Sequence, residues 1–248
     1  MNRQTSAAVV LRRWPYSETS QVVRMLTPEH GVLPMLAKGV NKLTSGQAGV
    51  LDTWALVEAD FGGPDSRELL QLYKVKLLDR HSGISRDPDH ITAAALLAEA
   101  AELACPSGLP SSPVFLFLVE CLQELDGGTE LDGFLCQRIS QILGLLGLAP
   151  HLESLDHPSD SPLWFSPSGG GIMPPGSPRP TDLAYRLKPA QLELLKDFCS
   201  NPVKARQAPL SEVADCLTIL GEFLCYHLER PPKAWAVLQQ RRKAVAHS

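Results

Sequence analysis

The chain has 248 residues, of which 44% are hydrophobic and 20% are charged, so it is long enough for one large or two modest domains with apolar cores. No window approaches eighteen uninterrupted apolar residues and the N-terminus lacks a secretory-signal pattern, which argues against a membrane-spanning helix and favours a soluble, cytoplasmic protein. The formal charge of -4 is uneven, because residues 1–50 carry a net +4 and residues 81–170 a net -10, so the N-terminal part can attract a polyanion that the middle repels.

Five strand-like runs fill the first eighty residues. They are rich in Val, Leu, Trp and Tyr, are separated by turn-forming residues, and cover 7–13, 21–27, 32–40, 51–61 and 69–78. The third run ends in a basic, glycine-containing loop over residues 38–42. Five short strands with a basic surface predict an OB-fold over residues 1–80, a partly open Greek-key barrel that binds oligonucleotides. A generic small barrel without DNA affinity fits the same pattern.

The pattern changes to helical spacing from Asp89 onward. Residues 91–104 are rich in Ala and Leu, and apolar side chains then recur every three or four residues over 115–125, 135–146 and 210–228. Because each apolar face needs another to cover it, these stripes predict an all-α helical bundle domain over residues 81–248, and an α+β fold for the chain. Residues 151–181, packed with Pro, Ser and Gly, predict a long irregular insertion.

Catalytic motifs are not found in the sequence. There is no phosphate-binding loop, zinc-protease motif or nucleophile elbow, and the Gly169-Gly170-Gly171 run lacks the lysine of a phosphate cradle. The six cysteines form no CxxC pair, and we interpret them as buried, reduced thiols. We interpret Glu99 and Glu102 as an exposed helix surface. We therefore expect no enzyme activity, no catalytic residue, no cofactor and no bound metal.

An ordered series of short motifs resembles the bacterial recombination mediator family RecO. The N-terminal part of the series is Glu18-Thr19-Ser20, the 26–31 turn Leu-Thr-Pro-Glu-His-Gly, and Ala37-Lys38-Gly39. The C-terminal part is the 145–150 run Leu-Leu-Gly-Leu-Ala-Pro followed by the 165–171 run Phe-Ser-Pro-Ser-Gly-Gly-Gly. The resemblance covers nearly the whole chain, and its specificity comes from the order of the motifs.

The resemblance implies a DNA-binding protein of DNA repair and recombination, associated with the nucleoid. Members of the RecO family bind single- and double-stranded DNA, anneal complementary strands, and with RecR load RecA onto DNA coated by single-strand-binding protein. The expected partners are therefore both forms of DNA, RecR, RecA, RecF and the acidic C-terminal tail of single-strand-binding protein. We place the tail at an apolar pocket with a basic rim over residues 210–230. No membrane partner is expected.

Annealing requires neutralisation of two phosphate backbones by a weak, reversible grip. The candidate DNA-binding residues in the barrel are Arg12, Arg13, Arg24, Lys38, Lys42, Lys74 and Lys76. Trp14, Tyr16 and Tyr73 are candidates for base stacking, with a place in the barrel core as the alternative. A second basic cluster contains Arg241, Arg242 and Lys243; it either extends the DNA track or is an ordinary helix end whose cations face the helix dipole.

The sequence departs from the RecO pattern at its zinc knuckles. Family members commonly carry two CxxC pairs after the Ala149-Pro150 position, where this chain reads Ser154-Leu155-Asp156-His157 and Met173-Pro174-Pro175-Gly176. Zinc needs about four thiolate or imidazole ligands, and only His151 and His157 are nearby. The loop is therefore predicted to be a degenerate knuckle without zinc.

One rival from a different functional class stays open, namely an OB-fold protein-interaction scaffold without DNA activity. Salt dependence separates the two, because phosphate binding weakens linearly on a log-log plot of affinity against salt. A DNA binder should also be weakened for all sequences alike by Lys38→Glu combined with Lys42→Glu.

Overall fold

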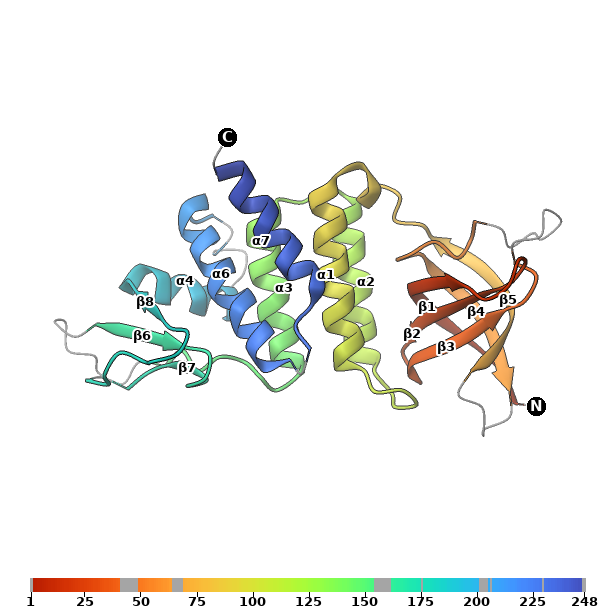
Figure 1. Ribbon diagram of the computed structural model, residues 1–248, viewed down its shortest axis with the longest axis horizontal. Helices are drawn as coiled ribbons and strands as arrows, with labels where there is room; N and C mark the ends of the chain where they lie inside the picture. The colour runs from red at the N-terminus through yellow and green to blue at the C-terminus, as the bar shows by residue number, and fades with distance from the viewer. Residues whose placement is uncertain are drawn as a thin grey trace. The chain divides into compact units, whose positions relative to one another are not determined.

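A computed structural model of the chain describes residues 2–246, except 41–48, 64–68, 154–161, 175, 201–204, 206 and 229. The chain divides into two units, Met1–Thr129 and Glu130–Ser248 (Figure 1). The predicted domain boundary at residue 80 falls at the end of the last barrel strand, and it stays a prediction. None of the helices in the described ranges is long and apolar enough to cross a membrane.

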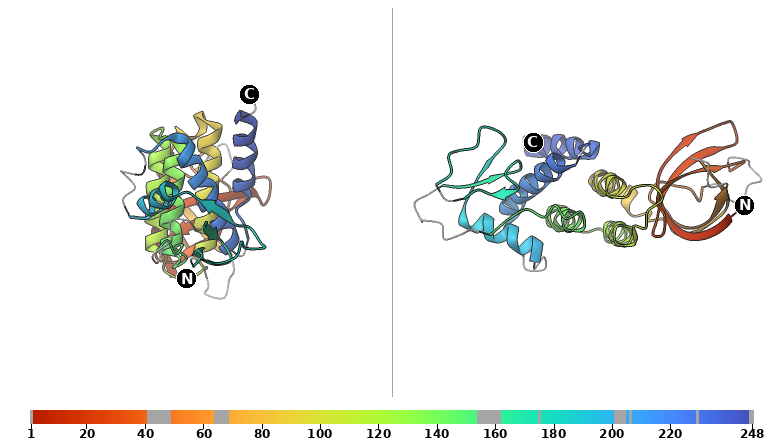
Figure 2. Two further views of the ribbon diagram at one scale, coloured as in Figure 1. Left: turned by 90° about the vertical axis from the view of Figure 1, so that its left-hand side faces the viewer. Right: turned by 90° about the horizontal axis from the view of Figure 1, so that it is seen from below.

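The first unit begins with a closed five-stranded barrel, seen end-on in the right-hand view of Figure 2. Its strands are β1 (Asn2–Pro15), β2 (Gln21–Thr27), β3 (Gly31–Ala37), β4 (Leu56–Gly63) and β5 (Leu70–Asp79). They are joined in the order β1-β2-β3-β5-β4, with β3 and β5 parallel and the other pairs antiparallel. Alternate side chains of all five strands fill the interior. The predicted OB-fold is confirmed.

Several strand boundaries differ from the prediction, three of them by three residues or more. β1 starts at Asn2, because polar residues that show no alternation in the sequence still pair with β4 along its whole length. Residues 51–55 are not a strand: Trp54 has a φ of 68°, outside the extended region, and its N–H donates to Val10 O at 2.7 Å. Residues 38–40 form a turn at the end of β3.

Two helices complete the first unit after a short 3-10 turn, η1 (Ile84–Arg86). α1 (Pro88–Ala104) is capped by the Asp87 carboxylate, which accepts the Asp89 N–H at 2.7 Å, and α2 (Ser112–Asp126) packs against it. The loop between them contacts the β2–β3 turn, where Gly108 N–H donates to His30 O at 2.9 Å. Gly31 in that turn has a φ of 63°, and a Cβ there would overlap the carbonyl of Pro106.

The second unit contains four described helices: α3 (Leu131–Leu145), α4 (Pro189–Ser200), α6 (Leu210–His227) and α7 (Lys233–Ala246). α3 packs against α4 and α6, and the two latter helices pack against each other. The sequence stripes predicted α3 and α6. They missed α7, whose first turn buries Trp235 against Gly221 of α6 while its indole N–H donates to Glu222 Oε1 at 2.9 Å.

The predicted irregular insertion at 151–181 is not confirmed, because part of the described segment forms short strands. Residues Leu163–Ser166 (β6) and Gly171–Ile172 (β7) are antiparallel strands, and Tyr185–Leu187 (β8) pairs with the other edge of β6. These strands are too short for alternation to show in the sequence. Phe165 is fully buried, with its ring centroid 5.5 Å from that of Phe223 on α6, so the small sheet is anchored to the helices.

The cysteines give a testable consequence of this packing. The prediction that all six are buried is confirmed for four, Cys105, Cys121, Cys136 and Cys216, and is wrong for Cys225, which is half-buried, and Cys199, which is exposed. Burial raises the pKa of the Cys136 and Cys105 thiols, raises that of Cys216 to about 12, and also raises that of Cys199. We expect a disulfide reagent at pH 8 to titrate Cys199 slowly in the native protein, and all six thiols only after denaturation. Rapid native reaction of more than two thiols would contradict this packing.

Candidate nucleic-acid interface

Two of the predicted DNA-binding arginines are paired with acids of α1. Arg12 and Arg24 lie opposite each other on β1 and β2. Arg12 Nε is 3.3 Å from Glu102 Oε2 and its Nη2 is 3.6 Å from Glu99 Oε1, while Arg24 Nε is 2.8 Å from Glu102 Oε1. The acids therefore separate two like charges that would otherwise repel across the strand pair.

The expectation that Glu99 and Glu102 form an exposed helix surface is wrong. Their side chains are only 20% and 14% exposed, because α1 turns this face toward the barrel. The three-residue spacing in the sequence placed both carboxylates on one face, but it could not show that the partners lie on strands nearly eighty residues earlier.

A second group of ion pairs engages Arg13. Its Nη2 lies 3.4 Å from Asp52 Oδ1, and Arg80 pairs with the other oxygen of the same carboxylate. Near the start of β1, Arg3 Nε donates to Asp60 Oδ1 at 2.6 Å, which holds the pKa of Asp60 below its ordinary value. Most of the arginine charge that the sequence counts in this region is thus matched by a nearby acid.

The lysines differ from the arginines in this respect. Among the residues that the structure describes, Lys38, Lys74 and Lys76 form no ion pair closer than 4 Å, and all three are exposed; we call them the lysine strip. Lys74 and Lys76 lie two residues apart on the outer face of β5, with the buried Val75 between them. Lys38 follows Ala37, the last residue of β3 that pairs with β5. Lys42 lies outside the described residues.

Tyr73 belongs to the same surface because of a strand irregularity. The β4–β5 register shifts between Asp60 and Phe61, whose partners are Lys74 and Leu72, so Tyr73 is an extra residue in the ladder. Such a bulge redirects a side chain. The Tyr73 ring is 37% exposed, with the Arg3 guanidinium 5.2 Å from its centroid. The Arg3 guanidinium lies over the Tyr73 ring, and partly exposed aromatic rings beside cations are typical of surfaces that bind single strands.

Trp14 and Tyr16 are also on the surface, with 43% and 63% of their side chains exposed. Tyr16 opens the β1–β2 loop, where its N–H donates to Ser20 O at 2.9 Å. The Ser20 hydroxyl in turn accepts the Gly39 N–H at 3.3 Å, so this loop adjoins the turn that carries Lys38. The three aromatic candidates thus lie on the surface of the barrel, and two of them are next to the lysine strip.

The C-terminal basic cluster lies on α7. Arg242 pairs with Asp132 at the start of α3, and Arg241 and Lys243 also have partners of their own. These contacts favour a structural role in docking α7. A DNA-binding role for this cluster stays a prediction.

The described residues do not fit the zinc site of the family resemblance. Within the described ranges, no group of three His, Cys, Asp or Glu side chains converges, and His157 lies outside those ranges. His151 is held by its backbone instead: its N–H donates to Gly170 O at 2.9 Å and its carbonyl accepts the Ile172 N–H at 2.8 Å. A Cβ at Gly171 would overlap this backbone, so the strand pairing itself closes the segment.

Comparison with known proteins covers nearly all of the chain. Residues 1–81 match the family described as "Recombination protein O N terminal", and residues 85–236 match "Recombination protein O C terminal". A protein named DNA repair protein RecO from Pelotomaculum thermopropionicum is 29% identical over 255 residues, covering 97% of this chain and 95% of its own length. Its namesakes from Nocardioides sp. and Synechococcus elongatus are 28% and 27% identical, covering 94% and 98% of this chain and 98% and 88% of their own lengths.

Proposed function

The chain belongs to the recombination protein O family, whose members act in DNA repair, and we propose that it is a DNA-binding recombination mediator. In this proposal it binds single- and double-stranded DNA, anneals complementary strands, and with RecR promotes the loading of RecA on single-stranded DNA coated by single-strand-binding protein. It acts by binding and positioning DNA, without catalytic chemistry of its own.

The observation that carries the DNA-binding part is the lysine strip beside Tyr73. Three exposed ammonium groups without an ion pair among the described residues lie on and next to one strand of an OB-fold barrel. Ammonium groups bind phosphates and an exposed ring stacks on bases in a sequence-tolerant manner. This pattern suits a protein that must hold any sequence weakly enough to release it after annealing.

The partners of this proposal are DNA, RecR, RecA, RecF and the tail of single-strand-binding protein. The tail is acidic and apolar, and it would bind the second unit near α6. Leu210 and Tyr226 are exposed apolar side chains near the two ends of that helix, 68% and 55% accessible, and either one offers the tail an apolar contact.

The test of the proposed function is annealing of two complementary fluorescent oligonucleotides across a salt series, with and without single-strand-binding protein. Acceleration that falls as salt rises is the expected result. If the chain neither binds DNA nor accelerates annealing, the OB-fold scaffold is the better assignment, and the near-complete pairing of the arginines with acids would be its structural basis.

Neutralising the two acids of α1 is predicted to raise the affinity for DNA. Glu99→Gln with Glu102→Gln should release Arg12 and Arg24 and raise affinity for single-stranded DNA about 25-fold at 0.1 M salt, which is about fivefold for each arginine that then binds a phosphate. The same change should lower the free energy of unfolding by about 1 kcal/mol, because three partly exposed ion pairs are lost. Fluorescence anisotropy and urea unfolding measure the two effects.

A matched control removes two exposed acids of the second unit, Glu153→Gln with Asp182→Asn, and changes the net charge equally. Its effect on affinity should be less than about twofold, since only long-range charge is altered. If both double variants bind DNA with equal affinity, Arg12 and Arg24 are not part of the DNA-binding surface.

A further inference from the structure

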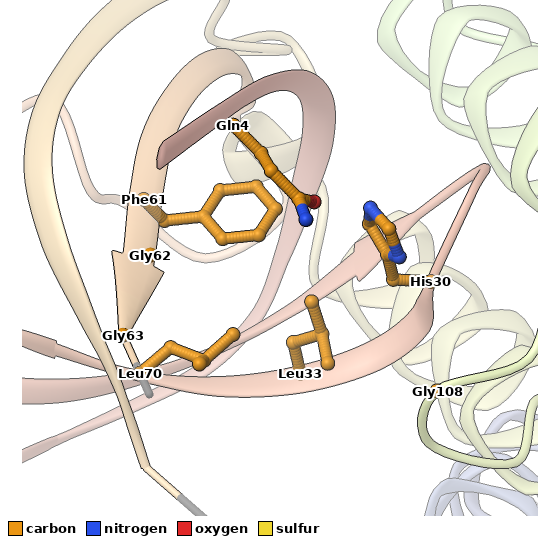
Figure 3. A pocket seen from close by; sticks show the side chains of 8 residues that line it. All are labelled: Gln4, His30, Leu33, Phe61, Gly62, Gly63, Leu70 and Gly108. Carbon is orange, nitrogen blue, oxygen red and sulfur yellow. The ribbon is translucent and has the colours of Figure 1, made fainter. Parts of the chain in front are cut away.

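A cavity of about 450 Å³ opens at one end of the barrel (Figure 3). Its apolar walls are Phe61 of β4, Leu33 of β3 and Leu70 at the start of β5. Among the described residues, β5 pairs with β3 only along Met35–Ala37, and the cavity lies beside the first half of β3, beyond that pairing. The volume lies in the range of small-molecule sites.

Two hydrogen-bonding side chains face this apolar space. The Gln4 amide reaches it from β1 and the His30 imidazole from the β2–β3 turn, and Figure 3 shows both directed toward the space between Phe61 and Leu33. Neither side chain makes a hydrogen bond with another described residue. Both side chains are half-buried, so water reaches them in the free protein, and a ligand in the cavity with matching donors and acceptors can take the place of that water.

The His30 ring is held in place before any ligand arrives. Its backbone N–H donates to Thr27 Oγ1 at 3.2 Å and its carbonyl accepts the Gly108 N–H from the α1–α2 loop. Its ring meets the Phe61 ring edge-on, with 6.1 Å between centroids. A site whose groups are already positioned loses little entropy on binding.

The lining determines the class of ligand. Within the described part of the chain, the lining is apolar apart from Gln4 and His30, so the described walls suit a neutral ligand. A purely aliphatic ligand would leave Gln4 and His30 unpaired. A flat, neutral heterocycle with polar edges satisfies both requirements: its faces contact Phe61, Leu33 and Leu70, and its edge can meet a glutamine amide, which pairs in bidentate fashion with adenine. Gly62 and Gly63 leave the β4 backbone open to close approach.

We propose that this barrel-mouth pocket receives one unstacked nucleobase. The inference rests on the proposed DNA binding for its source, since Leu70 begins the strand that carries Lys74 and Lys76, and phosphates held by the lysine strip would leave a base near the pocket. The pocket would give the protein a grip on single strands that a paired duplex, with its bases stacked, cannot use.

The test separates the base from its phosphate. Ligand-detected NMR measures binding of the uncharged nucleoside deoxyadenosine to the full chain and to Gln4→Leu, which keeps the volume and removes the amide. We expect Gln4→Leu to weaken nucleoside binding about tenfold or more, the range for loss of a bidentate pair. Thr5→Leu, the exposed neighbour on the same strand, should change nothing, and circular dichroism checks that both variants are folded.

A single-stranded oligonucleotide with one 2-aminopurine distinguishes the source of the base. We expect the native chain to change the 2-aminopurine fluorescence and Gln4→Leu to lose this change, while the affinity of Gln4→Leu for the oligonucleotide stays within about threefold of native. This result supports a base taken from DNA. If the chain binds the nucleoside in a Gln4-dependent way but does not bind the oligonucleotide, the pocket is a site for free nucleosides. That result would overturn the proposed function. Oligonucleotide binding with both signals unaffected by Gln4→Leu overturns the pocket and leaves DNA binding intact.

Discussion

Replacing Lys38, Lys74 and Lys76 together by glutamine is expected to lower the affinity for single-stranded DNA about 100-fold at 0.1 M salt. Each lysine that neutralises one phosphate of a single strand contributes about 0.7 to the slope of log affinity against log salt. Over one decade of salt, from 1 M to 0.1 M, this is about fivefold for each contact, and three contacts multiply to about 100-fold. Anisotropy titrations over the same salt range give both the affinity and the slope.

Glutamine is the suitable replacement because of the strand opposite. Asp60 and Glu58 on β4 pair in register with Lys74 and Lys76, so reversal to glutamate would place like charges across the ladder and destabilise the barrel. Glutamine removes the charge, keeps most of the stem, and leaves the fold intact.

The matched control for the lysine strip removes three cations of the second unit, Arg186→Gln, Lys188→Gln and Lys196→Gln. The net charge changes equally, but the barrel surface does not. The strip variant should lose about 2 from the salt slope and the control less than about 0.5. If both triple variants weaken binding equally, the effect is one of net charge and the lysine strip is not the DNA surface.

The sequence predicted those features of this surface that depend on residues close together in the chain. The five barrel strands and the helices α1, α2, α3 and α6 follow from side-chain periodicity, and the basic turn at Lys38 follows from composition. The short strands β6, β7 and β8 did not show, since two to four residues cannot establish a period.

Long-range contacts account for what could not be predicted in the candidate site. Whether Arg24 is available to DNA depends on Glu102, and whether Tyr73 lies in the core or on the surface depends on a register shift against β4. Periodicity carries neither fact. Counting basic residues therefore placed arginines and lysines of the barrel together, whereas the structure pairs Arg12, Arg13 and Arg24 with acids and leaves Lys38, Lys74 and Lys76 without an ion pair among its described residues.

α7 shows the same dependence on a single distant contact, and Gly221→Ala is expected to lower the free energy of unfolding of the second unit by about 3 kcal/mol. A Cβ at Gly221 would overlap the Trp235 ring, which is only 5% exposed and cannot shift within its packing. The indole must leave α6, and displacing a buried tryptophan costs about 3–5 kcal/mol, against a gain of about 1 kcal/mol from replacing a helical glycine. Urea unfolding followed by far-ultraviolet circular dichroism measures the net loss.

The chain contains its own control for the helix-propensity gain. Gly144 lies in α3 with open space around the position of a Cβ, so Gly144→Ala should stabilise by about 0.5–1 kcal/mol. If Gly221→Ala lowers the free energy of unfolding and Gly144→Ala raises it, the difference is due to the Trp235 contact, because both changes replace a glycine in a helix of the same unit. If Gly221→Ala is as stable as the native chain, the indole does not occupy the α6 surface. The docking of α7 would then have to rest on other contacts, the Arg242–Asp132 ion pair among them.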